Sequence, residues 1–186
     1  MENTEKLWCP NIRFGTFDLD IIGINYELND FTVIVVSTEN VSEKVISQYA
    51  REMITKGCRS FAFCGYSSDH WHRIFDEVDI EINNESDEVS LTWEIDSINV
   101  LPDELGICKE NALILCTNYE TVRIVHSAIV EQGYGFKVRY IGKDSVTINR
   151  NMEYYVLSIE KGWFRVLTEL DEDYLFPPQL FEIVDY

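Results

Sequence analysis

The chain has 186 residues, of which 46% are hydrophobic and 13% aromatic, enough to bury the core of one domain or of two small ones. It holds 15 lysines and arginines against 33 aspartates and glutamates, so its formal net charge is −18 at pH 7. This charge excludes nonspecific binding to nucleic acid and to anionic membranes, since both would repel the protein, and it favours a basic protein partner.

The negative charge is concentrated in the first part of the chain. Residues 1–132 hold 9 Lys/Arg and 24 Asp/Glu, whereas residues 133–186 hold 6 and 9. No basic residue occurs between Arg73 and Lys109. Seven acidic residues of this stretch are predicted to form a face that attracts a cationic partner: Asp76, Glu77, Asp79, Glu81, Glu85, Asp87 and Glu88.

In chain order, residues 20–25 are expected to form an edge strand, and residues 31–37 follow as a β-branched run typical of a strand buried on both faces. Asn40 and Glu43 have the spacing of a capping box, which predicts that a helix begins there. Six apolar residues then recur at helical spacing: Val45, Ile46, Tyr49, Ala50, Met53 and Ile54. Gly57 is expected to end this helix before a second strand over residues 58–64.

The same alternation of strand and helix continues to residue 133. A helix is predicted over residues 69–79, a strand over 89–93, a short helix over 101–105 and a buried strand over 112–116. Thr117 and Glu120 form a second predicted capping box, and Gly133 ends the helix that follows. Four strand and helix pairs predict an α/β domain over residues 1–133: a small, doubly wound, mostly parallel sheet with helices on both faces.

From residue 134 the pattern changes to short strand signals without helices between them, over residues 136–141, 154–160, 163–168, 174–176 and 181–184. About fifty residues of this kind predict a second domain, residues 134–186, that closes as a small β-barrel.

Two segments of this second part carry a family resemblance. Gly162-Trp163-Phe164-Arg165-Val166 and residues 176–184, which begin Phe-Pro-Pro-Gln-Leu-Phe, resemble the Gly-Trp strand and the closing Phe-Pro-x-x-aromatic segment of bacterial SH3-like domains. The resemblance implies a groove for proline-rich peptides lined by Tyr140, Trp163 and Pro177. Leu180 departs from the pattern, because a groove tyrosine is usual there, and residues 142–151 are short for the acidic loop of that family. In the alternative interpretation, these aromatic residues only pack the barrel or dock it on the first domain.

Residues 31–118 more faintly resemble a family of small bacterial α/β domains of unknown function, through Gly57-Cys58, Cys64-Gly65, Trp71 and Leu91-Thr92-Trp93. That resemblance implies no activity.

A ligand pocket is a second hypothesis for the first domain, because doubly wound sheets bind ligands at the carboxyl ends of their strands. The candidate residues there are Ser37, Thr38, Gly65, Tyr66 and Asn118. Helix capping explains the same polar residues equally well. The chain has no Gly-x-Gly-x-x-Gly and no phosphate-binding Gly-Lys-Ser/Thr sequence, so we expect no nucleotide cofactor.

Catalytic and metal-binding motifs are not evident. His70 and His72 are two residues apart and would lie on different sides of a helix, and His126 lies in an apolar helix, so we expect no metal site. The five cysteines, Cys9, Cys58, Cys64, Cys108 and Cys116, form an odd set that lies largely in apolar runs, which favours free buried thiols in a reducing cytoplasm. The sequence shows no signal peptide and no apolar run of about 20 residues, so a membrane location is not expected.

From these patterns we expect a non-enzymatic, bacterial-type, acidic binding protein that engages a basic partner. An immunity-type inhibitor of a nuclease toxin, or an anti-defence mimic of nucleic acid, suits the charge. The alternatives are a small hydrolase or ligand sensor that uses the strand ends, and a peptide-binding adaptor that uses the SH3-like groove.

Overall fold

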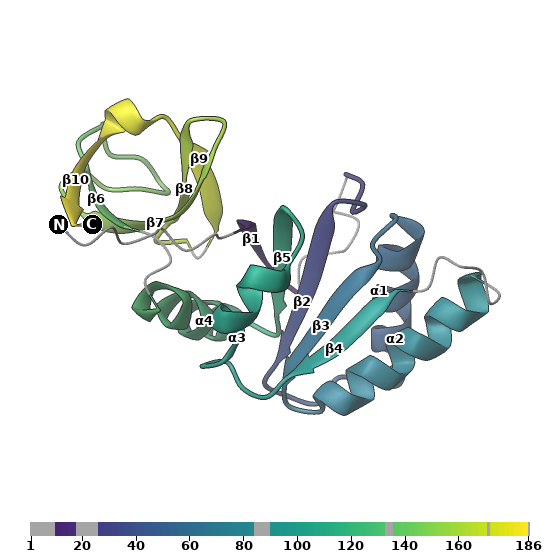
Figure 1. Cartoon of the computed structure of the whole chain (residues 1–186). Coiled ribbons are helices and arrows are strands. Elements are labelled where there is room, and N and C mark those ends of the chain that lie inside the picture. The colour runs from purple at the N-terminus through teal and green to yellow at the C-terminus, as the bar shows by residue number, and fades with distance from the viewer. Residues whose placement is uncertain (1–9, 18–25, 84–89, 133–135, 171, 186) are drawn as a thin grey trace, which may run out of the picture.

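The computed structural model describes residues 10–17, 26–83, 90–132, 136–170 and 172–185 (Figure 1). Its first part consists of the following elements: β1 (Asn11–Thr16), β2 (Phe31–Ser37), α1 (Glu43–Thr55), β3 (Ser60–Gly65), α2 (Ser68–Asn83), β4 (Leu91–Ile95), α3 (Leu101–Glu104), a 3-10 turn (Leu105–Ile107), β5 (Asn111–Cys116) and α4 (Tyr119–Glu131). Among the helices of the described segments, none is long and apolar enough to cross a membrane.

The five strands of this part form one parallel sheet in the order β1-β5-β2-β3-β4. From β2 the chain moves outward to β3 and β4, and it then returns to the other side of β2 to form β5. The direction of winding therefore reverses between β2 and β5. In open α/β sheets this switch point is where ligand-binding crevices occur, at the carboxyl ends of the strands.

Helices cover both faces of the sheet, as the sequence predicts. Val33 and Val35 of β2 pack in the core beneath α1 and α2, whereas Ile34 and Val36 pack in the core beneath α3 and α4. Successive side chains of a strand point to opposite faces, so a strand that is buried on both faces must be apolar at every position. The continuous apolar run of β2 has this cause.

The helix starts differ from the predicted capping boxes. Helix α1 begins at Glu43 with Ser42 as its N-cap residue, whose side chain makes no capping hydrogen bond. Helix α4 has Asn118 as its N-cap instead of Thr117, and the Asn118 side chain accepts a hydrogen bond from the Thr121 amide. Thr117 does not cap because its hydroxyl is hydrogen-bonded to Thr38 on a neighbouring segment. Tertiary contacts thus moved the cap by one residue.

Strand β1 was not predicted from the sequence. It pairs in parallel with β5 along its whole length, from Asn11 opposite Asn111 to Thr16 opposite Cys116. The edge strand expected over residues 20–25 lies outside the described residues. Because β1 is a short edge strand that contains Asn, Arg and Gly, it lacks the β-branched run that marks the central strands.

The second part of the chain is a separate antiparallel sheet. Its elements are β6 (Phe136–Tyr140), β7 (Glu153–Glu160), β8 (Trp163–Leu167), β9 (Asp173–Phe176), a 3-10 turn (Pro178–Leu180) and β10 (Phe181–Asp185), in the sheet order β10-β6-β7-β8-β9. Within the described segments β9 and β10 do not pair, so the sheet is not the closed barrel that we expected. Pro177 and Pro178, which lack an amide hydrogen, lie between these two edge strands.

The second sheet contacts the first part at β1 and α4 (Figure 1). Leu157 of β7 and Leu167 of β8 belong to the same core cluster as the α3 and α4 face of the parallel sheet. His126 of α4 packs edge-on between Phe14 of β1 and Tyr155 of β7. His126 is therefore a residue of the contact between the two sheets.

Candidate functional site

The carboxyl ends of the parallel strands bring the predicted pocket residues together. Ser37 and Gly65 are opposite one another at the ends of β2 and β3, and the Tyr66 amide donates to the Ser37 carbonyl at 2.7 Å. The Thr38 amide donates to Thr117 Oγ1 at 3.0 Å, one residue before Asn118. Ser37, Thr38, Gly65, Tyr66 and Asn118 therefore lie along one edge, on the adjacent ends of β3, β2 and β5.

Gly65 is required by this close approach. Its φ is +90°, and a Cβ added there would lie 2.3 Å from the Ser37 carbonyl oxygen. Only glycine adopts this backbone conformation without strain and leaves room for a backbone atom so near.

Threonine side chains join the two strands at the switch point. Thr38 Oγ1 lies 2.8 Å from Thr117 Oγ1 and 3.2 Å from Thr121 Oγ1. Asn118 Oδ1 accepts from the amide and the hydroxyl of Thr121 at 2.9 and 3.0 Å. These groups are paired with one another, so the cluster ties β2 to β5 and caps α4. Thr117 precedes the predicted pocket residue Asn118 at the end of β5, whereas Thr121 was not predicted, although its place in the first turn of a capped helix is visible in the sequence.

Negative charge gathers at the same edge. Four exposed acidic residues, which we call the acidic rim, follow the carboxyl ends of strands or lie in the first turns of α2 and α4: Glu39, Asp69, Asp96 and Glu120. At the opposite edge, where the strands begin, basic side chains hydrogen-bond to backbone carbonyls. Arg59 donates to the Ile54 carbonyl at 2.7 Å, and Lys109 donates to the Asn29 carbonyl at 2.6 Å. Exposed acids also lie at this second edge, at Glu27, Asp30 and Glu110, where they are mixed with these cations.

The predicted acidic face on α2 is largely engaged in intramolecular contacts. Glu77 accepts from Arg73 at 2.7 Å, Glu81 is paired with Arg51, and Asp76 accepts from the hydroxyl of Thr92 at 3.0 Å. Glu85, Asp87 and Glu88 lie outside the described residues.

Asp79 corrects that prediction, because its side chain does not lie on the surface. It is 4% exposed and accepts hydrogen bonds from the Ser90 amide, at 2.8 Å, and from the Asn83 side chain. Asp79 lies four residues after Phe75 and eight after Trp71, on the buried face of the helix. This spacing was visible in the sequence, and it identifies Asp79 as a structural carboxylate that holds the chain after α2.

The three residues of the implied peptide groove lie in different environments. Tyr140 is buried, its hydroxyl donates to the Lys143 carbonyl at 3.0 Å, and its ring contacts Phe176 and Phe181. Trp163 is 47% exposed, and Pro177 is half-buried. Because Tyr140 alternates with Arg139 along β6, its side chain points into the core of the second sheet and does not line an open groove.

The two neighbouring histidines have different partners. His72 Nδ1 lies 3.0 Å from Glu94 Oε1, and its Nε2 lies 2.9 Å from the hydroxyl of Thr92. His70 Nε2 lies 3.7 Å from Glu43. Within the segments that the structure describes, no group of three or more His, Cys, Asp or Glu side chains is placed to hold a metal ion.

The four described cysteines are free and buried. Burial raises the pKa of the Cys58 thiol to about 11 and that of Cys64 and Cys108 to about 12, and it raises the pKa of Cys116 as well. These thiols are protonated at neutral pH, whereas a cysteine nucleophile acts as the thiolate. They pack as small apolar side chains. Cys9 lies outside the described residues.

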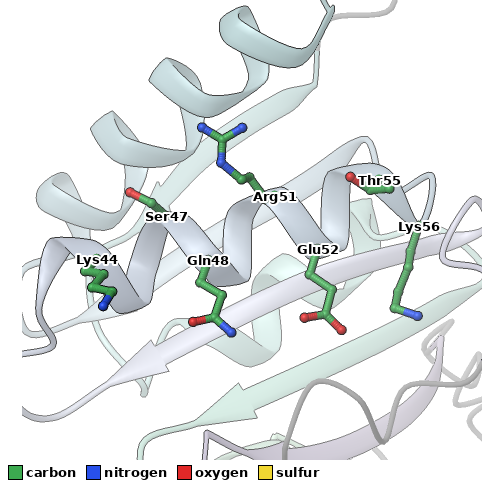
Figure 2. A pocket seen from close by; sticks show the side chains of 7 residues that line it. All are labelled: Lys44, Ser47, Gln48, Arg51, Glu52, Thr55 and Lys56. Carbon is green, nitrogen blue, oxygen red and sulfur yellow. The ribbon is translucent and has the colours of Figure 1, made fainter.

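A hollow of about 610 Å³ lies along the outer side of α1, lined by Lys44, Ser47, Gln48, Arg51, Glu52, Thr55 and Lys56. Figure 2 shows these side chains spread along the helix, with Arg51 pointing toward α2, where it pairs with Glu81. All of the described lining residues belong to one helix and the residue after it, so this hollow is a polar surface depression.

A second cleft, of about 200 Å³, lies where the two sheets meet. Its lining residues come from the end of β1, the first turn of α4 and the start of β9: Phe14, Gly15, Thr16, Tyr119, Val122, Glu172, Asp173 and Tyr174. It combines aromatic rings with two carboxylates, and it is not apparent from the sequence. No family model matches the chain, and no curated protein or solved structure matches it.

Proposed function

We propose that this chain is a non-enzymatic acidic binding protein whose acidic rim engages a basic protein partner. The observation that supports this most is the gathering of exposed carboxylates: Glu39, Asp69, Asp96 and Glu120 lie at one edge of the sheet, in a protein with a net charge of −18. A protein that acts on nucleic acid presents a basic surface, whose positive charge is complementary to the acidic rim. An immunity-type or anti-defence inhibitor that blocks such a surface is the role that fits this charge.

The polar groups at the switch point support binding over catalysis. The hydroxyls of Thr38, Thr117 and Thr121 are hydrogen-bonded within the protein, where they stabilise the edge. The buried thiols of Cys64 and Cys116 are held in the protonated form. An anionic substrate would also meet the carboxylates of the rim, so the rim itself disfavours nucleotides and phosphorylated metabolites.

The proposal predicts steep salt dependence. Charges on an exposed rim act over about 10 Å at 0.1 M salt, and they raise the association rate more than they slow dissociation. Raising the salt concentration from 50 to 300 mM should therefore weaken binding mainly through a slower association rate.

The test compares two charge-matched variants. In the rim variant, Glu39→Gln, Asp69→Asn, Asp96→Asn and Glu120→Gln are combined. In the control, four exposed acids elsewhere are neutralised: Glu27→Gln, Asp30→Asn, Glu110→Gln and Glu131→Gln. Both variants lose four negative charges, so they differ only in where the charge is removed.

Binding of a fluorescent decalysine peptide is measured for both variants by anisotropy at 50 and 300 mM NaCl. We expect the rim variant to bind at least about tenfold more weakly than the control at low salt, because each neutralised contact is worth a few tenths to one kcal/mol. Equal loss in both variants would mean that only the total charge matters. Binding that does not change with salt would contradict the proposal outright.

We also propose, as a second function, that residues 136–185 form an SH3-like module that binds a peptide through Trp163. Two observations support this: the Phe-Pro-Pro-Gln-Leu-Phe segment that begins at Phe176 forms the end of β9, a 3-10 turn and the start of β10, and the Trp163 side chain at the start of β8 is exposed. Buried Tyr140 limits any groove to Trp163 and Pro177 and their neighbours. Trp163→Ala should abolish binding of a proline-rich peptide while the unfolding midpoint changes little, and retained binding would rule this function out.

A further inference from the structure

The cleft between the two sheets rests on a buried cluster of ion pairs. Arg165 of β8 is 5% exposed in its side chain and pairs with Glu160 and with Asp173. The other oxygen of Asp173 accepts from the Phe14 amide of β1 at 3.2 Å. Asp173 therefore joins the second sheet to the edge of the first, and its charge is balanced by the Arg165 guanidinium.

Among the described residues, no Lys or Arg side chain pairs with Glu172, the other carboxylate of the cleft. The Glu172 carboxylate accepts a hydrogen bond from the Tyr174 hydroxyl, a contact that raises the pKa of Tyr174. The cleft residues Glu172 and Asp173 bring two negative charges, of which Arg165 balances one. Glu120 of the acidic rim lies next in the chain to the cleft residue Tyr119.

The cleft contains a buried hydroxyl group, that of Thr16, which has no hydrogen-bond partner among the described residues. Thr16 is 2% exposed, and within the described segments no group hydrogen-bonds to its Oγ1. Side chains alternate along β1, so Thr16 points to the same face as Phe14, the face that borders α4 and the cleft. A buried hydroxyl without a partner is unfavourable by about 1–3 kcal/mol, and a hydrogen-bonding ligand would remove this penalty.

Aromatic rings complete the lining. Phe14, Tyr119 and Tyr174 all line the cleft, and the two tyrosines are partly exposed to solvent. Aromatic faces attract organic cations, and the attraction is strongest where water is displaced. The volume of about 200 Å³ is below the roughly 300–1,000 Å³ of clefts that hold drug-sized ligands. It suits one side chain.

We propose that this cleft receives a single lysine or arginine side chain of the basic partner, with its cationic end between Glu172 and the hydroxyl of Thr16 and its aliphatic stem against the aromatic rings. This inference rests on the proposed function, since it names the place where a basic partner is anchored. The acidic rim attracts the partner over a distance, and the cleft fixes its position by contact.

The first test uses small probes with the full chain. N-acetyl-lysine methylamide and its uncharged counterpart, N-acetyl-norleucine methylamide, are titrated while the aromatic NMR signals of Tyr119 and Tyr174 are followed. We expect the lysine probe to shift both tyrosines with saturation, and the norleucine probe to bind at least about fivefold more weakly, because it lacks the charge. Equal binding of both probes, or no saturable shift with either, would overturn the inference.

The second test uses substitutions that should weaken binding of the lysine probe without lowering the stability of the fold. Thr16→Val removes an unpaired hydroxyl at constant shape, so it should leave the unfolding midpoint unchanged or higher and yet weaken the lysine probe about tenfold, the effect of one hydrogen bond to a charged group. Glu172→Gln should weaken the probe by a similar factor. Glu131→Gln, the same change near the last turn of α4, is the matched control and should have no effect. If Thr16→Val binds the lysine probe normally, its hydroxyl does not contact a ligand and the inference is wrong.

The outcome separates this inference from the proposed function. Normal binding of decalysine by Glu172→Gln and Thr16→Val, together with loss in the rim variant, would disprove the cleft and retain the acidic binding surface. If the rim variant and both cleft variants all bind decalysine normally, the proposed function is wrong. A saturable shift with the lysine probe would then still establish the cleft as a cation site.

Discussion

Arg165 forms buried ion pairs with Glu160 and Asp173, and substitution of Arg165 should destabilise the protein strongly. The Arg165 side chain is 5% exposed, and those of Glu160 and Asp173 are 14% and 9% exposed. Burial lowers the pKa of Arg165, but the hydrogen bonds and charges of Glu160 and Asp173 raise it by more, so the guanidinium stays charged. Arg165→Met keeps most of the stem and removes the charge.

The size of the loss in stability depends on the two carboxylates that Arg165→Met leaves without a cation. Removing one partner of a buried ion pair strands an uncompensated buried charge and costs about 3–5 kcal/mol. Here two carboxylates lose their cation, and Asp173 also holds the Phe14 amide of the other sheet. We therefore expect a loss of about 3–5 kcal/mol in the free energy of unfolding.

Urea unfolding followed by circular dichroism measures this loss, and the same substitution on another strand of the same sheet, β6, is the control. Arg139 pairs at 3.1 Å with Glu153, and both side chains are about two fifths exposed, at 41% and 42%. Exposed pairs contribute roughly 0–1 kcal/mol, so Arg139→Met should change stability by no more than about 1 kcal/mol. Combining Arg165→Met with Glu160→Gln and Asp173→Asn should restore at least half of the loss, because no buried charge remains. Equal effects of Arg165→Met and Arg139→Met would refute the reasoning.

Three further predictions concern buried groups of the first part. Asp79→Ala leaves two hydrogen-bond donors without an acceptor, so it should lower the free energy of unfolding by about 1–3 kcal/mol in urea titrations. An unchanged free energy of unfolding would contradict the structural role of the Asp79 carboxylate. The pKa of the Cys58 thiol rises from about 9 in the unfolded chain to about 11 in the fold, so its contribution to stability is lost as pH rises between these values; Cys58 alone should account for a loss of about 1.3 kcal/mol between pH 8 and pH 10, and Cys58→Ala should make the pH slope shallower by about that amount. Gly65→Ala forces a Cβ toward the Ser37 carbonyl at positive φ and should cost about 1–3 kcal/mol or more, whereas Gly106→Ala, which meets no atom within 4 Å, should stay within about 0.5 kcal/mol by thermal denaturation.

The sequence alone determined the elements of this protein whose patterns are local. The continuous apolar run of β2 and the helical spacing of Ile46, Met53 and Trp71 identified central strands and amphipathic helices because a buried face must be apolar with the period of its element. The same spacing already placed Asp79 on a buried face, although the run of acidic neighbours suggested a surface role. The change from strand and helix pairs to strands alone marked where the second sheet begins.

Only the tertiary structure decided which distant segments meet. Strand β1 belongs to the sheet because β5 lies beside it, and its own residues carry little strand signal. The acidic rim exists because parallel strands bring Glu39, Asp96 and Glu120 to one edge, although long stretches of chain separate them. The cleft needs Thr16 at the end of β1, Tyr119 at the start of α4 and Glu172 just before β9. Periodicity reports only which face of an element is buried, whereas strand order and the docking of two sheets depend on contacts between segments far apart in the chain.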